Sequence, residues 1–247
     1  MTASRAAIGR DGLRVKIAVQ RVRLGGEEFR VIRPVAPLNN AALYETGHRY
    51  EIYVDRTDGR RIGTLWLLAA RSPRSLVHLP MRATPTAPGT GWRDERPLDL
   101  VLAHRSLQFR PSRWKRLRQC ISAGNAPREL RTAGVPESDV LPDRKTGHAT
   151  PGAAGDQRNG NLLRWHLHAE TLFLTGTTRA FRESAPPFFA VTKEGPPAAA
   201  TELYLPGPGC NYHVCRDFSA RQGLHPQSQD EFHVVFSPRW VHGAARR

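Results

Sequence analysis

The string RWHLHAE at residues 164–170 places His166 and His168 two positions apart, with Glu170 two positions further on. Alternate residues of a β-strand share one face, so the two imidazoles could hold a divalent cation with the carboxylate as a third ligand. A bound Mg²⁺ or Mn²⁺ would support hydrolysis of a phosphodiester. Ten histidines in 247 residues give about 0.4 such pairs by chance. The sequence therefore favours two half-exposed strand histidines with no cofactor, and the metal site is the alternative.

The histidine pair also carries a resemblance to a known family. A His-hydrophobic-His strand with a tyrosine after it resembles the core of the HUH-type single-strand nucleases, and FHVVFSPRW at residues 232–240 is similar to the opening strand of small tyrosine transposases in that class. The resemblance implies that His166 and His168 hold the metal and that Tyr204 or Tyr212 attacks the scissile phosphate. In that class the opening strand precedes the histidine motif, whereas here it follows it. Pro206 and Pro208 also follow Tyr204 closely, where the family carries its nucleophile on a helix.

A second set of possible metal ligands lies near the carboxyl terminus. Four nitrogen or sulfur ligands that Zn²⁺ would accept are Cys210, His213, Cys215 and His225. Their spacing is not the C-x₂-C knuckle typical of zinc sites, so zinc is the weaker alternative. The chain has three cysteines, which leaves at least one unpaired in any intramolecular disulfide scheme and favours a reducing compartment.

The most basic segment of the chain is HRSLQFRPSRWKRLRQ, residues 104–119, in which no acidic residue occurs. Salt bridges within the segment therefore cannot account for its cations. Aromatic rings lie among the cations, so the segment could contact phosphates and stack on bases. The alternative is a solvated basic helix face. The residues predicted to bind nucleic acid are Arg105, Arg110, Arg113, Trp114, Lys115, Arg116 and Arg118.

The overall charge favours a polyanionic partner. Lys and Arg number 37 against 22 Asp and Glu, which gives a net charge of +15 and a pI near 11.0. Residues 1–118 contain 23 of the basic and 10 of the acidic residues, so the excess lies in the first half of the chain. A GC-rich coding sequence is the competing explanation for the many arginines, but it does not by itself explain an excess confined to one half.

Period-two patterns predict strands in the first half. Residues 13–35 alternate apolar and polar side chains on both sides of Gly25-Gly26, which predicts a hairpin. Residues 49–70 predict a second hairpin with its turn at Asp58-Gly59. Its return strand would run through Ile62, Leu65 and Trp66. Residues 72–99 predict mainly loop, with a possible short strand at 75–80.

The rest of the chain predicts less regular structure. One basic helix is expected within residues 111–124, from an inward stripe of Trp114, Leu117 and Ile121. Together the patterns predict an α+β fold that is mainly antiparallel β. A small β-barrel-like or meander domain with the basic helix would cover residues 1–122, a disordered linker residues 123–161, and a weakly structured region residues 162–247.

The favoured function is a non-catalytic nucleic-acid-binding protein, for DNA or RNA, that contacts the phosphate backbone through the basic helix and a β face. One alternative is a metal-dependent nuclease or nicking enzyme that uses His166 and His168. The other is a basic interaction protein for an acidic protein partner. The longest apolar run, LWLLAA, is far too short to cross a bilayer, and charges interrupt the amino terminus before any signal-like apolar stretch, so we expect a cytoplasmic protein.

Overall fold

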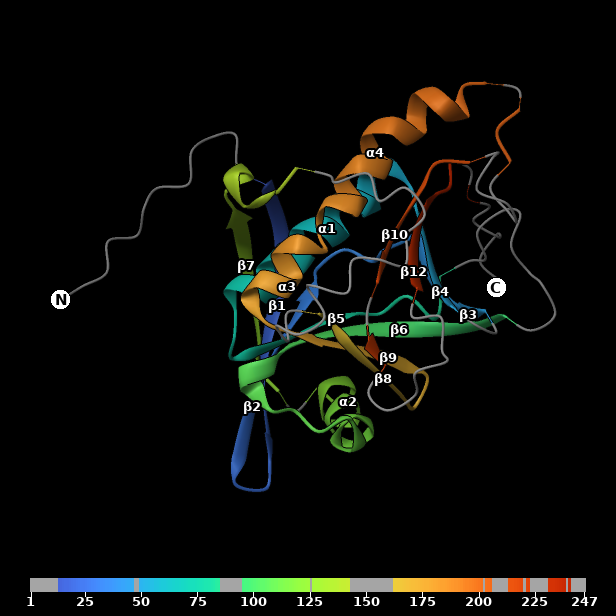
Figure 1. Cartoon of the computed structure of the whole chain (residues 1–247). Coiled ribbons are helices and arrows are strands. Elements are labelled where there is room, and N and C mark those ends of the chain that lie inside the picture. The colour runs from blue at the N-terminus through green and yellow to red at the C-terminus, as the bar shows by residue number, and fades with distance from the viewer. Residues whose placement is uncertain are drawn as a thin grey trace, which may run out of the picture.

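The computed structural model describes residues 13–46, 49–84, 95–124, 126–142, 162–201, 203–205, 213–219, 221–222, 231–238 and 240. These residues form a mixed α+β fold with a mostly antiparallel, open sheet (Figure 1). The strands are β1 (Leu13–Leu24), β2 (Glu27–Pro34), β3 (Ala41–Thr46), β4 (Arg49–Val54), β5 (Ser75–Leu79), β6 (Glu95–His104), β7 (Arg128–Val135), β8 (Arg164–His168), β9 (Thr171–Gly176), β10 (Cys215–Ser219), β11 (Arg221–Gln222) and β12 (Glu231–Phe236). The helices are α1 (Arg56–Arg71), α2 (Trp114–Ser122), α3 (Thr178–Glu183) and α4 (Pro186–Ala199), with 3₁₀ helices η1 (Arg105–Leu107), η2 (Pro111–Arg113) and η3 (Glu137–Asp139).

Strand β6 joins two parts of this sheet. Its first residues, as far as Leu98, pair with β3, and its residues from Asp99 to His104 pair with β9. The order across the sheet is β10-β12-β4-β3-β6-β5-β2-β1-β7, and β8 pairs with both β9 and β11. Every residue of β6 from Leu98 to Ala103 is buried, as expected for a central strand covered on both faces.

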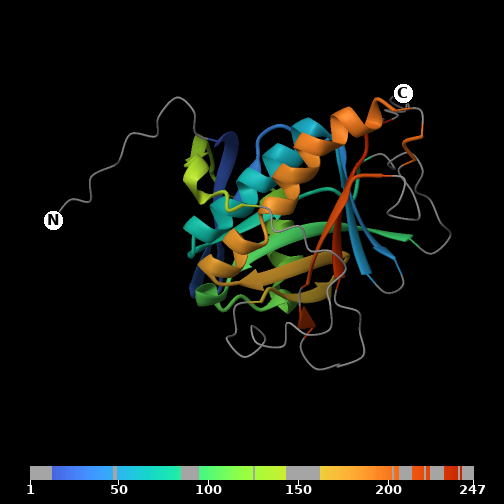
Figure 2. The same ribbon diagram turned by 45° about the horizontal axis from the view of Figure 1, so that its top comes forward.

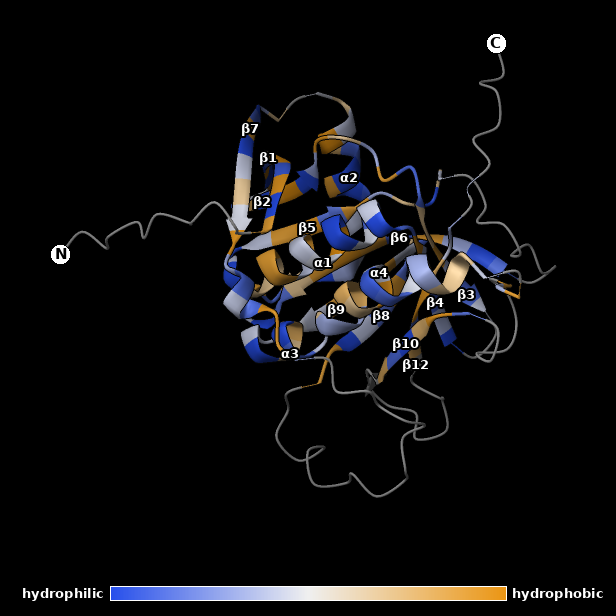
Figure 3. Cartoon of the chain, turned by 90° about the horizontal axis from the view of Figure 1, so that it is seen from above, coloured by the Kyte–Doolittle hydropathy of each residue, from blue (hydrophilic) through white to orange (hydrophobic). Residues whose placement is uncertain are grey.

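Helix α1 lies between the sheet and a layer made by α3 and α4 (Figures 1 and 2). All residues from Ile62 to Ala70 are buried, so this part of the helix is enclosed on every side. Trp66 stands at its centre, with ring contacts to Phe181 and Phe188 and an indole N–H that donates to Ser184 Oγ at 2.9 Å. Seen from above, hydrophobic residues gather on α1 and the central strands (Figure 3).

Helix α2 packs on the opposite face of the sheet from α1 (Figure 1). Trp114, Leu117 and Ile121 are all buried, so the predicted inward stripe is confirmed. Together with residues of β1, β2, β5, β6 and β9 they form a second core. Neighbouring residues of one strand, such as Val31 and Ile32, go to different cores because alternate side chains of a strand point to opposite faces.

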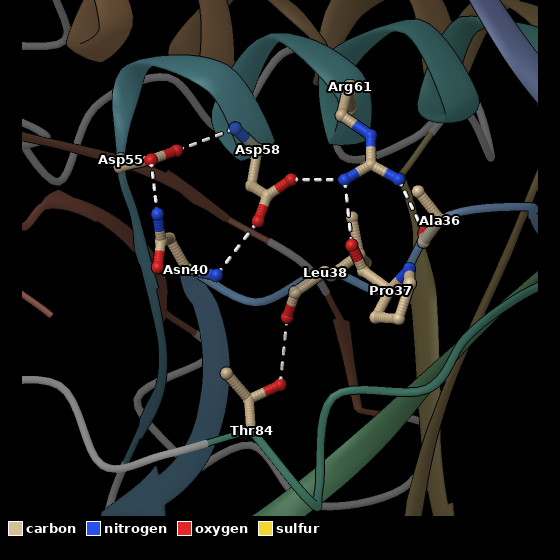
Figure 4. A network of polar contacts seen from close by, with 8 residues as sticks. All are labelled: Ala36, Pro37, Leu38, Asn40, Asp55, Asp58, Arg61 and Thr84. Atoms are coloured by element: carbon tan, nitrogen blue, oxygen red, sulfur yellow. Dashed lines mark hydrogen bonds and ion pairs between the residues drawn. The ribbon is translucent and has the colours of Figure 1, made fainter. Parts of the chain in front are cut away.

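A polar network fixes the start of α1 to the connection between β2 and β3 (Figure 4). Asp55 is the N-cap, and its carboxylate accepts the Asp58 amide at 2.6 Å and the Asn40 side-chain amide at 2.7 Å. The Asp58 carboxylate is buried and accepts the Asn40 backbone amide at 2.8 Å and the Arg61 guanidinium at 2.5 Å. Burial raises the pKa of Asp58, although both of these donors act in the opposite direction.

The first predicted hairpin is confirmed, and the second is wrong. β1 and β2 pair in antiparallel register around Gly25-Gly26, and β4 forms over part of the second predicted hairpin. Residues 56–71 then form α1 instead of a turn and a returning strand. The spacing gives the reason, because Ile62, Leu65, Trp66 and Ala69 fall at i, i+3, i+4 and i+7, which is the period of a helix.

The predicted linker contains a paired strand. Residues 128–135 form β7, which pairs with β1 along its whole length, so the prediction of disorder is wrong for them. β7 has little apolar content to bury, and Leu130 is 63% exposed, so its order comes from backbone hydrogen bonds to β1. Residue 125 and residues 143–161 of the predicted linker lie outside the described residues.

The described strands from residue 162 onward belong to the same sheet as those of the first half. β9 pairs with β6, and β12 pairs with β4, so strands on both sides of the predicted domain boundaries are hydrogen-bonded to each other. α4 forms within the region that was predicted to be weakly structured. Pro186 and Pro187 occupy its first turn, where no amide donor is needed, while Pro196 and Pro197 lie inside the helix near its end. The described strands form an open sheet and not the predicted barrel. None of the described helices is long and apolar enough to span a membrane.

The β1–β2 turn predicts different effects for its two glycines. Gly25 has a φ of +65° whereas Gly26 has no positive φ, and a Cβ at either position would meet no atom within 4 Å. We expect Gly25→Ala to lower the free energy of unfolding by about 1 kcal/mol, because alanine is strained in the left-handed region. Gly26→Ala is the matched control and should cause no loss. Urea denaturation measures both variants, and equal effects would contradict this turn geometry.

Candidate nucleic-acid interface

The predicted basic segment follows β6 and folds into η1, η2 and α2. His104 caps η1 by accepting the Ser106 amide at 3.2 Å, and Gln108 ends η1 in the left-handed region, with φ 49°. Pro111 begins η2, where its fixed φ suits the start of a helix. The buried stripe of α2 then holds the segment on the sheet. Polar residues between these anchoring points are left at the surface.

Trp114 belongs to the core beneath this segment. Its side chain has no exposed surface, and its indole N–H donates to Thr171 Oγ1 on β9 at 3.0 Å. The ring also meets Phe109 and Phe173 edge-on. A ring held in this way packs α2 against the sheet and presents no face on which a base could stack.

Two of the predicted phosphate-binding cations have carboxylate partners. Arg113 forms an ion pair with Glu27 on β2, donates to the Leu24 carbonyl oxygen at 2.8 Å and lies 4.8 Å from the centre of the Phe29 ring. Arg118 is half-buried, with its guanidinium 3.5 Å from the carboxylate of Asp99. Both cations therefore hold the segment in place.

The other four predicted cations are exposed. They are Arg105, Arg110, Lys115 and Arg116. None of them forms an ion pair with any residue in the part of the chain that the structure describes. Like charges that are close together repel one another, and only solvent, counterions or an anionic ligand can offset that repulsion here.

A cavity of about 620 Å³ lies between β2 and the residues that join η1 to η2, and one of these four cations, Arg110, lines it. Two aromatic rings line it, Phe29 and Phe109, whose centroids are 5.4 Å apart. Its volume lies within the range of sites that bind small organic groups. The lining residues are Glu27, Phe29, Leu107, Gln108, Phe109, Arg110, Ser112 and Arg113.

Beneath α2 lies a buried histidine that the sequence reasoning missed. His78 on β5 is 3% exposed, and neither of its ring nitrogens has a hydrogen-bond partner among the described residues. Its Nε2 lies 3.8 Å from Asp99 Oδ2, and its ring meets the Trp114 ring edge-on at 4.8 Å. Burial lowers the pKa of His78, against the opposing effect of the Asp99 carboxylate.

Asp99 on β6 is the buried carboxylate of this cluster. Its Oδ1 accepts the backbone amides of Met81 and Arg82, each at 3.0 Å. Burial alone would raise its pKa, but His78 and the two amides together lower it. The signal that could have revealed both residues is a titratable side chain inside an otherwise apolar strand string, SLVHL for His78 and PLDLVL for Asp99.

Strand β8 brings the histidine pair to the face of the sheet that α2 covers. His168 is directly opposite Thr171 and His166 is opposite Phe173, and directly opposite residues of antiparallel strands share a face. Their ring centroids are 6.4 Å apart, as expected for alternate residues of a strand. β8 also lies beside η2. The histidine pair and the basic segment are therefore neighbours in space, although they are far apart in the sequence.

Glu170, the predicted third metal ligand, does not join the histidines. Ala169 and Glu170 both have positive φ and form the two-residue turn between β8 and β9, which takes Glu170 off the strand face. Its carboxylate forms an ion pair with Arg82. Within the described ranges, no group of three or more His, Cys, Asp or Glu side chains is arranged to hold a metal ion.

The predicted nucleophile Tyr204 has a structural position. Its hydroxyl donates to the Phe236 carbonyl oxygen at 2.7 Å and accepts the Val214 amide at 3.2 Å. Burial raises the pKa of this phenol to about 12. Both bonds hold residues near β12 together, and a phenol with a raised pKa is a poor nucleophile. Tyr212 lies outside the described residues.

The weaker zinc set is described only in part. Cys215, at the start of β10, packs against a small core that includes Tyr44 and Tyr53, and His213 is half-buried two residues before it. Burial lowers the pKa of His213. Cys210 and His225 lie outside the described residues.

Comparison with known proteins gives no match, whether to a protein-family profile, a curated protein or a solved structure.

The buried His78 predicts a dependence of stability on pH. Its pKa in the folded state lies below the ordinary 6.5, so below that pH the unfolded chain binds a proton that the folded chain excludes. The free energy of unfolding should then fall as the pH drops below 6.5, with a limiting slope of about 1.4 kcal/mol per pH unit for one proton. We expect His78→Phe, which keeps an aromatic ring beside Trp114, to reduce this slope between pH 6.5 and 5. Urea denaturation at several pH values across that range measures the slope. If the slope in His78→Phe equals that of the parent chain, another group causes the pH dependence.

Proposed function

We propose that this chain binds nucleic acid by contacts to the phosphate backbone, through a surface that we call the basic surface. Its residues are Arg105, Arg110, Lys115 and Arg116, on η1, the η1–η2 connection and α2. The observation that supports the proposal is that these four cations are exposed and have no carboxylate partner among the described residues, and that one of them, Arg110, lines a cavity. Such cations release counterions when they meet phosphates, which is the main source of affinity for nucleic acid.

The pairing of arginines differs across the chain. Some guanidinium groups meet carboxylates, for example Arg49 with Glu51 and Arg71 with Asp139, each at 2.6 Å, whereas others, such as Arg56 and Arg60, are exposed. Within the segment itself, the two arginines that take part in packing are the ones that acquired acidic partners. The residues of the basic surface are therefore the cations of this segment that have no acidic partner among the described residues.

The geometry favours contacts to the backbone over readout of base edges in a groove. α2 spans only Trp114–Ser122 and is held on the sheet by its buried stripe, so it lacks the free sides of a recognition helix that enters a major groove. Phosphate contacts from such a surface fix position and orientation without sequence information. We therefore propose affinity for nucleic acid of many sequences.

A fourfold substitution tests this function on the full chain. We expect the variant Arg105→Gln, Arg110→Gln, Lys115→Gln, Arg116→Gln to bind duplex DNA and RNA more weakly. With three of the four cations reaching one backbone, the log–log slope of affinity against salt should become shallower by about 2.7 on duplex DNA. Fluorescence anisotropy at several salt concentrations measures both quantities, and the loss should be similar for unrelated sequences.

The matched control removes the same charge elsewhere. Arg14, Arg56 and Arg60 are exposed around the start of α1, and Lys193 is exposed on α4, so their replacement by glutamine changes three arginines and one lysine in the same way. We expect this control to keep most of the affinity and the slope. Equal losses in the two variants would mean that net charge alone drives binding, and an unchanged basic-surface variant would refute the proposed interface.

A further inference from the structure

We infer that the cavity beside the basic surface accepts one unstacked base, so that the ligand is single-stranded nucleic acid. The inference rests on the proposed function and adds the class of ligand and the mode of contact. Backbone contacts alone need only a charged surface, whereas this one is hollowed to about 620 Å³ and lined with aromatic rings. A base that is paired in a duplex is stacked between its neighbours and cannot enter such a cavity.

One wall of the cavity is rigid and aromatic. Phe29 on β2 meets Phe109 edge-on at 5.4 Å, and the Arg113 guanidinium lies 4.8 Å from the centre of the Phe29 ring. The Arg113 side chain is fixed there by the Leu24 carbonyl oxygen at 2.8 Å and by its ion pair with Glu27. Fixed rings and guanidinium planes are the groups on which single-stranded bases stack, because every base has a π-face. Phe29 is itself only 6% exposed and supports this wall from within, so the partly exposed planes are those of Phe109 and Arg113.

The Phe109 ring is held from behind and remains half-buried. It stacks on Phe173 of β9 at 6.0 Å and meets Trp114 edge-on at 6.4 Å. These contacts set the ring position before any ligand arrives, which lowers the ordering cost of binding. Phe109 lines the cavity, so its remaining exposed surface is available to a base, unlike that of the fully buried Trp114.

The lining of the cavity also includes polar groups. Gln108 is exposed and has φ 49° and ψ 33°, a left-handed conformation that is strained for a glutamine. Its amide can both donate to and accept from a base edge. Arg110 follows Phe109 directly and also lines the cavity, so a phosphate of the same strand can meet a cation while its base enters. Stacking, amide contact and charge thus meet within three successive residues.

The test compares strands that differ only in their bases. We would measure the affinity of the full chain for a short oligothymidine, for an abasic strand of equal length and for a duplex. Stacking of one base on aromatic side chains changes affinity about tenfold or more, so the oligothymidine should bind at least about tenfold more tightly than the abasic strand. Phe109→Leu should bring this ratio towards one, while its affinity for the abasic strand stays as in the parent chain.

Two further variants separate binding from folding. Phe109→Tyr keeps the ring and should keep the ratio. Gln108→Gly relieves the left-handed strain, so it should melt no lower than the parent chain while it lowers the ratio. Thermal melts accompany each variant.

The outcomes distinguish this inference from the proposed function. Equal affinity for the oligothymidine and the abasic strand, or tighter binding to the duplex, would overturn base insertion while backbone binding stands. A ratio that is unchanged in both Phe109→Leu and Gln108→Gly would likewise overturn it. Failure of all three ligands to bind would refute the proposed function itself.

Discussion

The Asp99 carboxylate lies at the point in β6 where the strand exchanges β3 for β9 as its neighbour. Its Oδ1 holds the two amides that follow β5, its own backbone amide donates to the Glu170 carbonyl oxygen at 3.0 Å, and its Oδ2 faces His78 and Arg118. One buried residue thus connects the end of β5, the β8–β9 turn and α2, through its carboxylate and its backbone amide. A carboxylate is tolerated at such a depth only because donors surround it.

The proposed interface depends on this arrangement. Arg118 reaches Asp99, and the Trp114 indole reaches Thr171, so α2 is fixed to the sheet by two polar contacts as well as by its apolar stripe. Because the side chains of Trp114 and Arg118 point towards the sheet, Lys115 and Arg116 lie on the outer side of the helix. The unpaired surface charge is therefore a product of the same packing that buries the polar cluster.

The sequence predicted local features well where the apolar residues follow a single spacing, that of a strand or that of a helix. The first hairpin, the short strand within residues 75–80 and the inward stripe of α2 follow directly from alternation or helical spacing. It failed where order comes from distant partners, as for β7, which is largely exposed and exists through its pairing with β1. It also failed at α1, where Asp58-Gly59 resembled a turn although Asp55 caps a helix there.

The candidate site was predictable only in part for a similar reason. The run of cations in residues 104–119 is visible in the sequence, but which of them the fold would neutralise is not. Arg113 and Arg118 find Glu27 and Asp99, which come from other strands. The cavity is likewise formed by β2 together with the η1–η2 connection, so no single segment encodes it.

The parallel pairing of β4 with β12 has a consequence for how the chain reaches this structure. Tyr50 pairs with Phe232, and β4 lies inside the sheet, between β3 and β12. Contacts between such distant residues carry a large loop-closure cost, so they slow folding. Until residues 231–236 have been synthesised, the β4 edge has unpaired backbone groups of the kind that recruit other strands. The chain thus completes its sheet late, and the amino-terminal half cannot finish folding before the carboxyl-terminal strand is available.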